Sequence, residues 1–152
     1  MKLDEIVDRM AIQDLITSHS VNAGRLDAAA IVANFTEDVV LRGISVLCGR
    51  PDVDLVGRDA IAELFAETFS SMVFLQQLSQ VTYVRIEGNI AQARAMVREC
   101  GLFRGQDMTI MMGNYEDEFL RTAEGWRFKK RSFTLVALGQ TAVNWLMLPG
   151  AG

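Results

Sequence analysis

Hydrophobic positions in the N-terminal half of the chain recur at helical spacing. From Leu3 to Val21, apolar residues return every three or four positions and charged residues occupy the other side, which predicts an amphipathic helix. A second, short helix is predicted over 28–35, because Asp27 suits its N-cap. A third helix is predicted after Gly57, with Asp59 as its N-cap.

The segment between the second and third helices is less regular. Val39-Val40-Leu41 is typical of a short strand. Residues 43–56 contain Gly49, Pro51 and several aspartates, which indicates a loop. Because this loop is long, we expect it to form a lid or rim.

From Phe74 onward the period changes from that of a helix to that of a strand. Four long strands are predicted at about 77–87, 91–102, 107–121 and 126–138, joined by turns that contain glycine. In the second strand the side chains of one face are small and those of the other are longer and more polar. Ala91, Ala93, Ala95 and Val97 alternate with Gln92, Arg94, Met96 and Arg98. Helices followed by antiparallel strands predict a single α+β domain over 1–152.

The last two strands form a hairpin, 113–131, whose first arm is acidic and whose second arm is basic. Opposite charges can pair across the strands. We therefore interpret Asp117 as one half of a structural ion pair, rather than as a catalytic acid.

Composition restricts the class of protein. The net charge of −4 and the pI near 5.0 argue against nucleic-acid binding, which needs a clustered basic face. Half of the 152 residues are hydrophobic, and this excess indicates a lined pocket or a subunit interface. The charged N-terminus lacks an apolar signal segment and no run is long enough to cross a membrane, so we expect a cytoplasmic protein with no membrane partner.

The residues do not predict a metal site or a disulfide bond. Cys48 and Cys100 are too few for a disulfide scaffold or a four-ligand zinc site, and we interpret both as reduced core thiols. One histidine and scattered carboxylates give no ligand spacing. We expect no metal and no cofactor.

Several segments together are similar to a known family. These are Ile12-Gln13-Asp14-Leu15, A-G-R-L-D-A at 23–28, F-T-E-D at 35–38, G-R-D-A-I at 57–61, and the hairpin pattern Y-x-D followed by G-W-R-F-x-x-R. They resemble the SnoaL-like branch of the nuclear transport factor 2-like superfamily, which includes polyketide cyclases, ketosteroid isomerase, scytalone dehydratase and a dehydrochlorinase. The resemblance implies a cone-shaped, strongly curved, mostly antiparallel sheet with three N-terminal helices covering its concave face.

The catalytic pair of the dehydratase-like members is missing here. In those members an Asp near the end of the first helix and a His at the start of the first long strand abstract a proton. The Asp position falls at Asn22 or Gly24, and the His position falls at Ser79, or at Gln77 in a shifted register. None of these four residues is a base at neutral pH.

The remaining candidates are an imidazole and two phenols. His19 is the only histidine; it either faces the cavity as a base or is exposed or hydrogen-bonded on its helix. Tyr83 and Tyr115 either donate to an oxyanion, as in the isomerases of the family, or fill the edge of the core. For substrate binding, the candidates are Asn22, Ser79, Met111 and Phe133.

Two functions stay open. One is a pocket for a small hydrophobic molecule, of aromatic or polycyclic type, used by a cofactor-independent lyase or isomerase. The other is a non-catalytic binding or assembly module, such as a subunit similar to the β chain of a ring-hydroxylating dioxygenase. Because family members commonly dimerise or trimerise, and the strand Tyr83-Val84-Arg85-Ile86 carries apolar groups on both faces, we expect a homodimer or homotrimer.

Overall fold

The computed structural model describes residues 2–142 and confirms the α+β prediction. The helices are α1 (Leu3–Gly24), α2 (Ala28–Val32) and α3 (Arg58–Ser70), with a short 3₁₀ helix, η1 (Ser45–Cys48). The strands are β1 (Phe35–Arg42), β2 (Leu55–Val56), β3 (Met72–Glu87), β4 (Ile90–Phe103), β5 (Met108–Thr122) and β6 (Gly125–Thr141).

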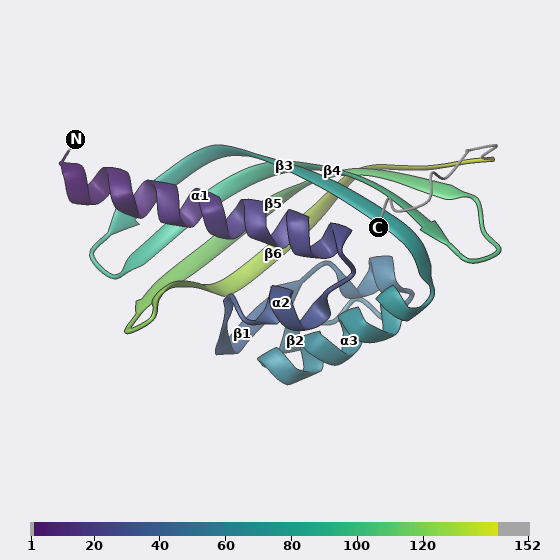
Figure 1. Ribbon diagram of the computed structural model, residues 1–152, viewed down its shortest axis with the longest axis horizontal. Helices are drawn as coiled ribbons and strands as arrows, with labels where there is room; N and C mark the ends of the chain where they lie inside the picture. Colours follow the sequence, from purple (N-terminus) through teal and green to yellow (C-terminus); the bar gives the residue numbers. More distant parts are fainter. Residues whose placement is uncertain (1, 143–152) are drawn as a thin grey trace.

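One curved, unclosed sheet contains all six of these strands in the order β2-β1-β6-β5-β4-β3. Neighbouring strands are antiparallel, except that β1 pairs with β6 in parallel. The four long strands arch over α1, while α2 and α3 lie beneath the arch, beside β1 and β2 (Figure 1). The core therefore fills the space between the concave face of the sheet and the helices.

The segment after α1 differs from the sequence prediction. The second helix ends at Val32, and β1 begins already at Phe35. Phe35 pairs with Phe128 on β6, and the centroids of the two rings are 5.4 Å apart. This contact takes the chain into the sheet before the helix can extend. The N-cap of α3 also differs from the prediction. The N-cap residue is Gly57, with a φ of +95°, and not Asp59.

The predicted loop at 43–56 contains two short elements, η1 and β2. Ile44 is buried under the sheet edge. Gly43 needs a φ of +77°, and a Cβ there would lie 2.2 Å from the Phe133 carbonyl oxygen. Only glycine fits this close approach, so the turn that delivers η1 beneath the sheet depends on it.

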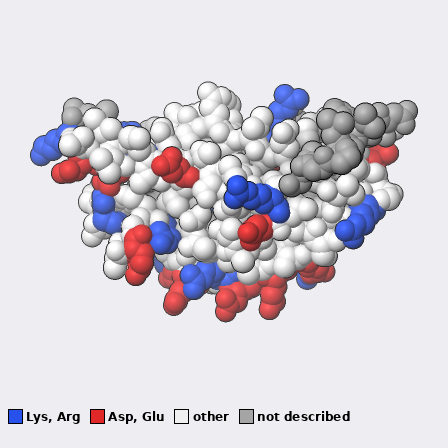
Figure 2. Space-filling view, viewed as in Figure 1, with Lys and Arg blue, Asp and Glu red and all other residues white. Residues whose placement is uncertain are grey.

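The outer face of the sheet carries exposed apolar side chains. Leu78, Met96, Met112 and Val136 come from four adjacent strands and are between 42% and 64% exposed. In the view of Figure 2, charged side chains gather mainly along the lower rim, over the helices, and at the two ends. Within residues 2–142, no helix is long and apolar enough to cross a membrane.

The predicted role of Asp117 is confirmed, because Asp117 and Arg131 form an ion pair. Both side chains are fully inaccessible, and Arg131 Nε lies 3.2 Å from Asp117 Oδ1. The guanidinium carbon also lies 3.7 Å from the centre of the Tyr115 ring and 4.7 Å from that of Phe128. Burial raises the pKa of Asp117 to about 7, although the Arg131 charge opposes this rise.

A substitution in this buried pair should lower the free energy of unfolding far more than one in the neighbouring Glu118–Lys130 pair. Asp117→Asn leaves the Arg131 charge buried without a counter-charge, and we expect a loss of about 3–5 kcal/mol in the free energy of unfolding. The matched control is Glu118→Gln, because Glu118 pairs with Lys130 on the same two strands at 3.6 Å and is only half-buried. That change should cost about 1 kcal/mol or less. Urea denaturation at pH 8 measures both, and equal losses would contradict the account.

Candidate functional site

A cavity of about 340 Å³ lies between the concave face of the sheet, the C-terminal half of α1, and the segments α3 and η1. Its wall is mainly apolar and includes Ala23, Ile31, Ile44, Leu47, Phe65, Phe69, Met72, Leu75 and Met111. Leu135 and Leu138 of β6 also line it and are 42% and 56% exposed. The volume is at the lower end of the range, about 300–1,000 Å³, that is usual for small-molecule sites.

Four polar side chains of the same wall come from three strands and a helix: His19 (α1), Gln77 (β3), Glu99 (β4) and Tyr115 (β5). Gln77 and Glu99 are register partners on adjacent strands, and Gln77 Nε2 donates to Glu99 Oε2 at 2.8 Å. Gln77 Oε1 in turn accepts from Ser20 Oγ at 3.0 Å. Gln77 and Glu99 are thus ordered by hydrogen bonds within a mainly apolar cavity.

Glu99 is the ionisable carboxyl of this network. Its side chain is partly buried, and burial raises its pKa above the usual 4.5, while the hydrogen bond from Gln77 opposes this shift. Desolvation penalises the charged form of a carboxyl group. The result is a carboxylate that holds a proton more strongly than a glutamate in water.

His19 is buried in the cavity wall with 3% of its surface exposed. Its ring lies 6.1–6.3 Å from four aromatic rings, those of Phe35, Phe65, Tyr115 and Phe128. Burial, and then the nearby charge of Arg131, lower the pKa of His19 well below 6.5. His19 is therefore neutral at pH 7, and its Nδ1 has no hydrogen-bond partner within residues 2–142.

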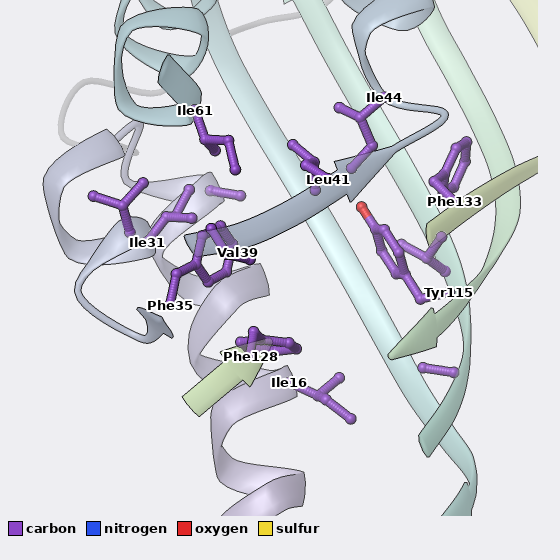
Figure 3. Close-up of a cluster of buried hydrophobic side chains, with 14 of the residues drawn as sticks. Ile16, Ile31, Phe35, Val39, Leu41, Ile44, Ile61, Tyr115, Phe128 and Phe133 are labelled. Atoms are coloured by element: carbon purple, nitrogen blue, oxygen red, sulfur yellow. The ribbon is translucent and has the colours of Figure 1, made fainter. Parts of the chain in front are cut away.

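Tyr115 presents its phenol to the same space. In Figure 3 the phenol oxygen points from β5 toward Leu41 and Ile44, with Phe133 beside the ring. The two ring centres are 5.2 Å apart. Burial raises the pKa of Tyr115 far above its ordinary value, against the effect of the Arg131 charge. The phenol therefore stays protonated and can donate a hydrogen bond.

The other predicted binding residues divide into two groups. Met111 lines the cavity, and Phe133 supports Tyr115 from behind. Ser79 and Asn22 are not among the lining residues: Ser79 Oγ lies 2.8 Å from Ser20 Oγ, and Asn22 Nδ2 donates to Ser18 Oγ at 3.3 Å. It is Gln77, the alternative register position for the missing histidine, that reaches the cavity.

The structure does not bring Tyr83 to the cavity. A register shift lies between Val81, which pairs with Ala95, and Tyr83, which pairs with Arg94. This irregularity reverses the alternation, so that Val84 is buried and Tyr83 lies on the outer face, 43% exposed. The expectation that Tyr83 could face the site is wrong for this reason, because an extra residue in a strand moves every later side chain to the opposite face.

Glu99 is a cavity residue that the sequence analysis did not single out. A signal for it was present, because Ala91, Ala93, Ala95 and Val97 define the inner face of β4. Continuing that alternation by one step places Glu99 on the same face. Cys48 also lines the cavity, and burial raises the pKa of its thiol. Within residues 2–142, no three His, Cys, Asp or Glu side chains gather as metal ligands do.

Sequence and structure comparisons decide the family. The profile of the SnoaL-like domain matches residues 4–132. The chain belongs to the SnoaL-like domain family. No curated protein matches the sequence.

Solved structures of the nuclear transport factor 2-like superfamily are similar over nearly the full chain. A protein of Novosphingobium aromaticivorans, provisionally assigned as an aromatic ring hydroxylase, is 28% identical, with a TM-score of 0.77, and 90% of this chain and 94% of that one are covered. A provisionally assigned scytalone dehydratase of the same species is 17% identical (TM-score 0.79; 96% and 95% covered). The hexachlorocyclohexane dehydrochlorinase LinA-type3 of Novosphingobium barchaimii is also 17% identical (TM-score 0.78; 97% and 99% covered). The last two similarities support the predicted cone fold alone.

The neutral state of His19 should make the stability of the SnoaL-like domain depend on pH. Below 6.5 the unfolded histidine binds a proton that the folded one does not, so stability falls as the pH falls, by at most about 1.4 kcal/mol per pH unit. His19→Gln removes the only histidine and should shift stability toward lower pH relative to the wild-type chain, because the opposite effect of the raised Asp117 and Glu99 pKa values is common to both chains. Urea denaturation at pH 7.5 and at pH 5 measures it; parallel profiles for the two chains would contradict a buried neutral imidazole.

Proposed function

We propose that this SnoaL-like domain binds a small, mainly apolar molecule, of aromatic or polycyclic type, and acts on it as a cofactor-independent lyase or isomerase. One observation carries the proposal. An apolar cavity of about 340 Å³ contains a small set of convergent polar groups, His19, Gln77, Glu99 and Tyr115. Apolar walls with a few placed polar groups are typical of small-molecule sites, and ionisable groups with shifted pKa values are typical of catalytic ones.

Tyr115 is the hydrogen-bond donor of this mechanism. Proton abstraction next to a carbonyl group leaves negative charge on the carbonyl oxygen, and a donor held in a dry site stabilises that charge. Tyr115 suits the role because it is buried and protonated, and because Phe133 and Arg131 pack against its ring. His19 is neutral, and its Nδ1 has no hydrogen-bond partner among the described residues, so it can contribute a second polar contact in the same wall.

The relatives support the proposed class of reaction. Scytalone dehydratase and hexachlorocyclohexane dehydrochlorinase are named for eliminations, and another similar structure is called ketosteroid isomerase-like. The 28% identical relative is named for action on aromatic rings, which agrees with the aromatic lining of this cavity by Phe65, Phe69 and Phe103.

A specific observation also favours assembly. Leu78, Met96, Met112 and Val136 are an exposed apolar group on the outer face of the sheet. We propose that a second copy of the chain covers this face, so that the protein is a homodimer or homotrimer. A non-catalytic assembly module would have the same outer face, and the cavity experiments below separate the two functions.

The role of Tyr115 can be tested with 2-naphthol and naphthalene as probes. Wild-type protein should bind 2-naphthol more tightly, because only 2-naphthol offers an oxygen to Tyr115. In Tyr115→Phe this preference should fall by about fivefold or more, as for the loss of one hydrogen bond of roughly 1 kcal/mol. Isothermal titration calorimetry measures the two dissociation constants. Tyr83→Phe, the outer-face control, should leave them unchanged.

Two outcomes would contradict this proposal. Failure of wild-type protein to bind either aromatic probe would exclude a pocket for such molecules. Equal effects of Tyr115→Phe and Tyr83→Phe would remove Tyr115 from the binding site.

The proposed assembly predicts a change of mass. Met112→Lys places a charge in the centre of the exposed apolar group and should convert the oligomer to monomers, because an unpaired charge is costly to bury in an interface. Analytical ultracentrifugation measures the mass. The control Glu116→Gln lies on the same face of β5, next to Arg94, and should keep the oligomer; a wild-type monomer would contradict the assembly.

A further inference from the structure

We propose that Glu99 is the general base of this site and that Gln77 is the residue that positions it. The inference rests on the proposed function of the cavity as a site of proton transfer. It replaces the absent His–Asp pair with a single carboxylate, which comes from β4 rather than from α1 and β3.

The hydrogen-bond network fixes the orientation of Glu99. Ser20 Oγ donates to Gln77 Oε1 at 3.0 Å, and this contact sets which way the Gln77 amide faces. The amide nitrogen is thereby turned to Glu99 and donates to Oε2 at 2.8 Å. Ser79 lies 2.8 Å from Ser20 and completes the support behind the network. Oε1 of Glu99 has no recorded partner within residues 2–142, so it is available to a ligand.

The charge around Glu99 also suits a base. Among the described residues no cation forms an ion pair with it. The titratable groups that share its cavity are His19 from α1, Cys48 from η1 and Tyr115 from β5, and none of the three brings a positive charge at pH 7. A carboxylate in such surroundings holds a proton more strongly than one in water, and a base works best when its pKa approaches the working pH.

Glu99 and Tyr115 are close enough to influence each other. The Glu99 charge contributes to the raised pKa of Tyr115. The strands bring them together, because Glu99 pairs with Met111 on β5, and Tyr115 lies on the same inner face of that strand. A base and an oxyanion donor in one wall are the two groups that enolisation needs. His19 suits the first role less well, because its lowered pKa makes it a weak base.

The reaction class is proton abstraction from a carbon next to a carbonyl group. The Glu99 carboxylate takes the proton, the C–H electron pair forms the new C=C bond, and the carbonyl π pair moves to the oxygen, where Tyr115 donates. In an isomerisation the protonated Glu99 returns the proton to a different carbon. In an elimination the oxygen pair re-forms the carbonyl group and the enolate C=C pair moves to the bond with the next carbon. The leaving group departs from that carbon with its electron pair and accepts the proton from Glu99.

The base can be tested without knowledge of the natural substrate. The probe is 5-nitrobenzisoxazole, a flat aromatic molecule. A base removes its ring C–H proton, the electron pair forms a nitrile, and the N–O bond breaks to release a coloured phenolate. Wild-type protein should accelerate this ring opening. Glu99→Gln should lower kcat/KM by about 100-fold or more, the usual size of a general-base contribution. Glu116→Gln, a surface carboxylate on β5, should leave it unchanged.

The pH profile is a second readout that does not depend on the folding of a variant. Wild-type kcat/KM should rise with pH, with a midpoint above 4.5, the ordinary pKa of a glutamate. Gln77→Met removes the donor that favours the ionised carboxylate, so the midpoint should move to higher pH while activity at high pH is retained. A purely structural role of Gln77 would lower activity at every pH without moving the midpoint.

Three outcomes would overturn the inference. The first is full activity in Glu99→Gln. The second is a wild-type kcat/KM that falls, rather than rises, through the midpoint as the pH increases. The third is binding of aromatic molecules with no turnover that depends on Glu99. The last would leave the cavity as a binding site and remove only its base. Absence of any aromatic binding, measured by calorimetry on the same samples, would instead contradict the proposed function itself.

Discussion

The buried ion pair between Asp117 and Arg131 is the interaction on which the rest of the structure depends. It joins β5 to β6 on the inner face of the sheet, and both side chains are removed from water. Removing two charges from water costs free energy, and the attraction between Asp117 and Arg131 offsets that cost. The guanidinium carbon also lies 3.7 Å from the centre of the Tyr115 ring, and, after burial, the Arg131 charge lowers the pKa of His19. The pair therefore packs against one residue of the cavity wall, Tyr115, and adds to the effect of burial on the pKa of another, His19.

On another side of the cavity, hydrogen bonds that begin at α1 orient Gln77 and Glu99. Ser20 on α1, Gln77 on β3 and Glu99 on β4 form a hydrogen-bonded line that crosses the inner face of the sheet. The helix thus orients an amide, and the amide orients a carboxylate. Tyr115, held by Arg131 and Phe133, approaches the same cavity from β5. Burial keeps the Tyr115 phenol protonated against the Arg131 charge, and burial also raises the pKa of the Glu99 carboxyl.

The sequence predicted the fold well because its signals were periodic. The helical spacing in α1, the alternation in β4 and the turn at Gly125 each specify one local structure. The charges of the hairpin likewise predicted the pairing of Asp117. Of the candidate residues, the structure places His19, Tyr115 and Met111 in the cavity wall.

The errors in the site arise where the strand register departs from simple alternation. A register shift between Val81 and Tyr83 moves the Tyr83 side chain to the outer face, and no local residue pattern predicts this shift. The boundary of α2 was misplaced because Phe35 is drawn into the sheet by Phe128, a residue distant in sequence. Glu99 was overlooked for a different reason: a lone acid near a strand end resembles a solvent-facing residue until the helices that cover it are in place.

The central claim is that Glu99, Gln77 and Tyr115 form one site for a small molecule inside the sheet. The most direct test is a crystal structure of the protein soaked with 2-naphthol. The account predicts the aromatic rings within the cavity, with the hydroxyl oxygen at hydrogen-bonding distance from the phenol of Tyr115 and close to the carboxyl of Glu99. A cavity filled by rearranged side chains, with the probe bound only at the outer face near Met96 and Met112, would contradict it.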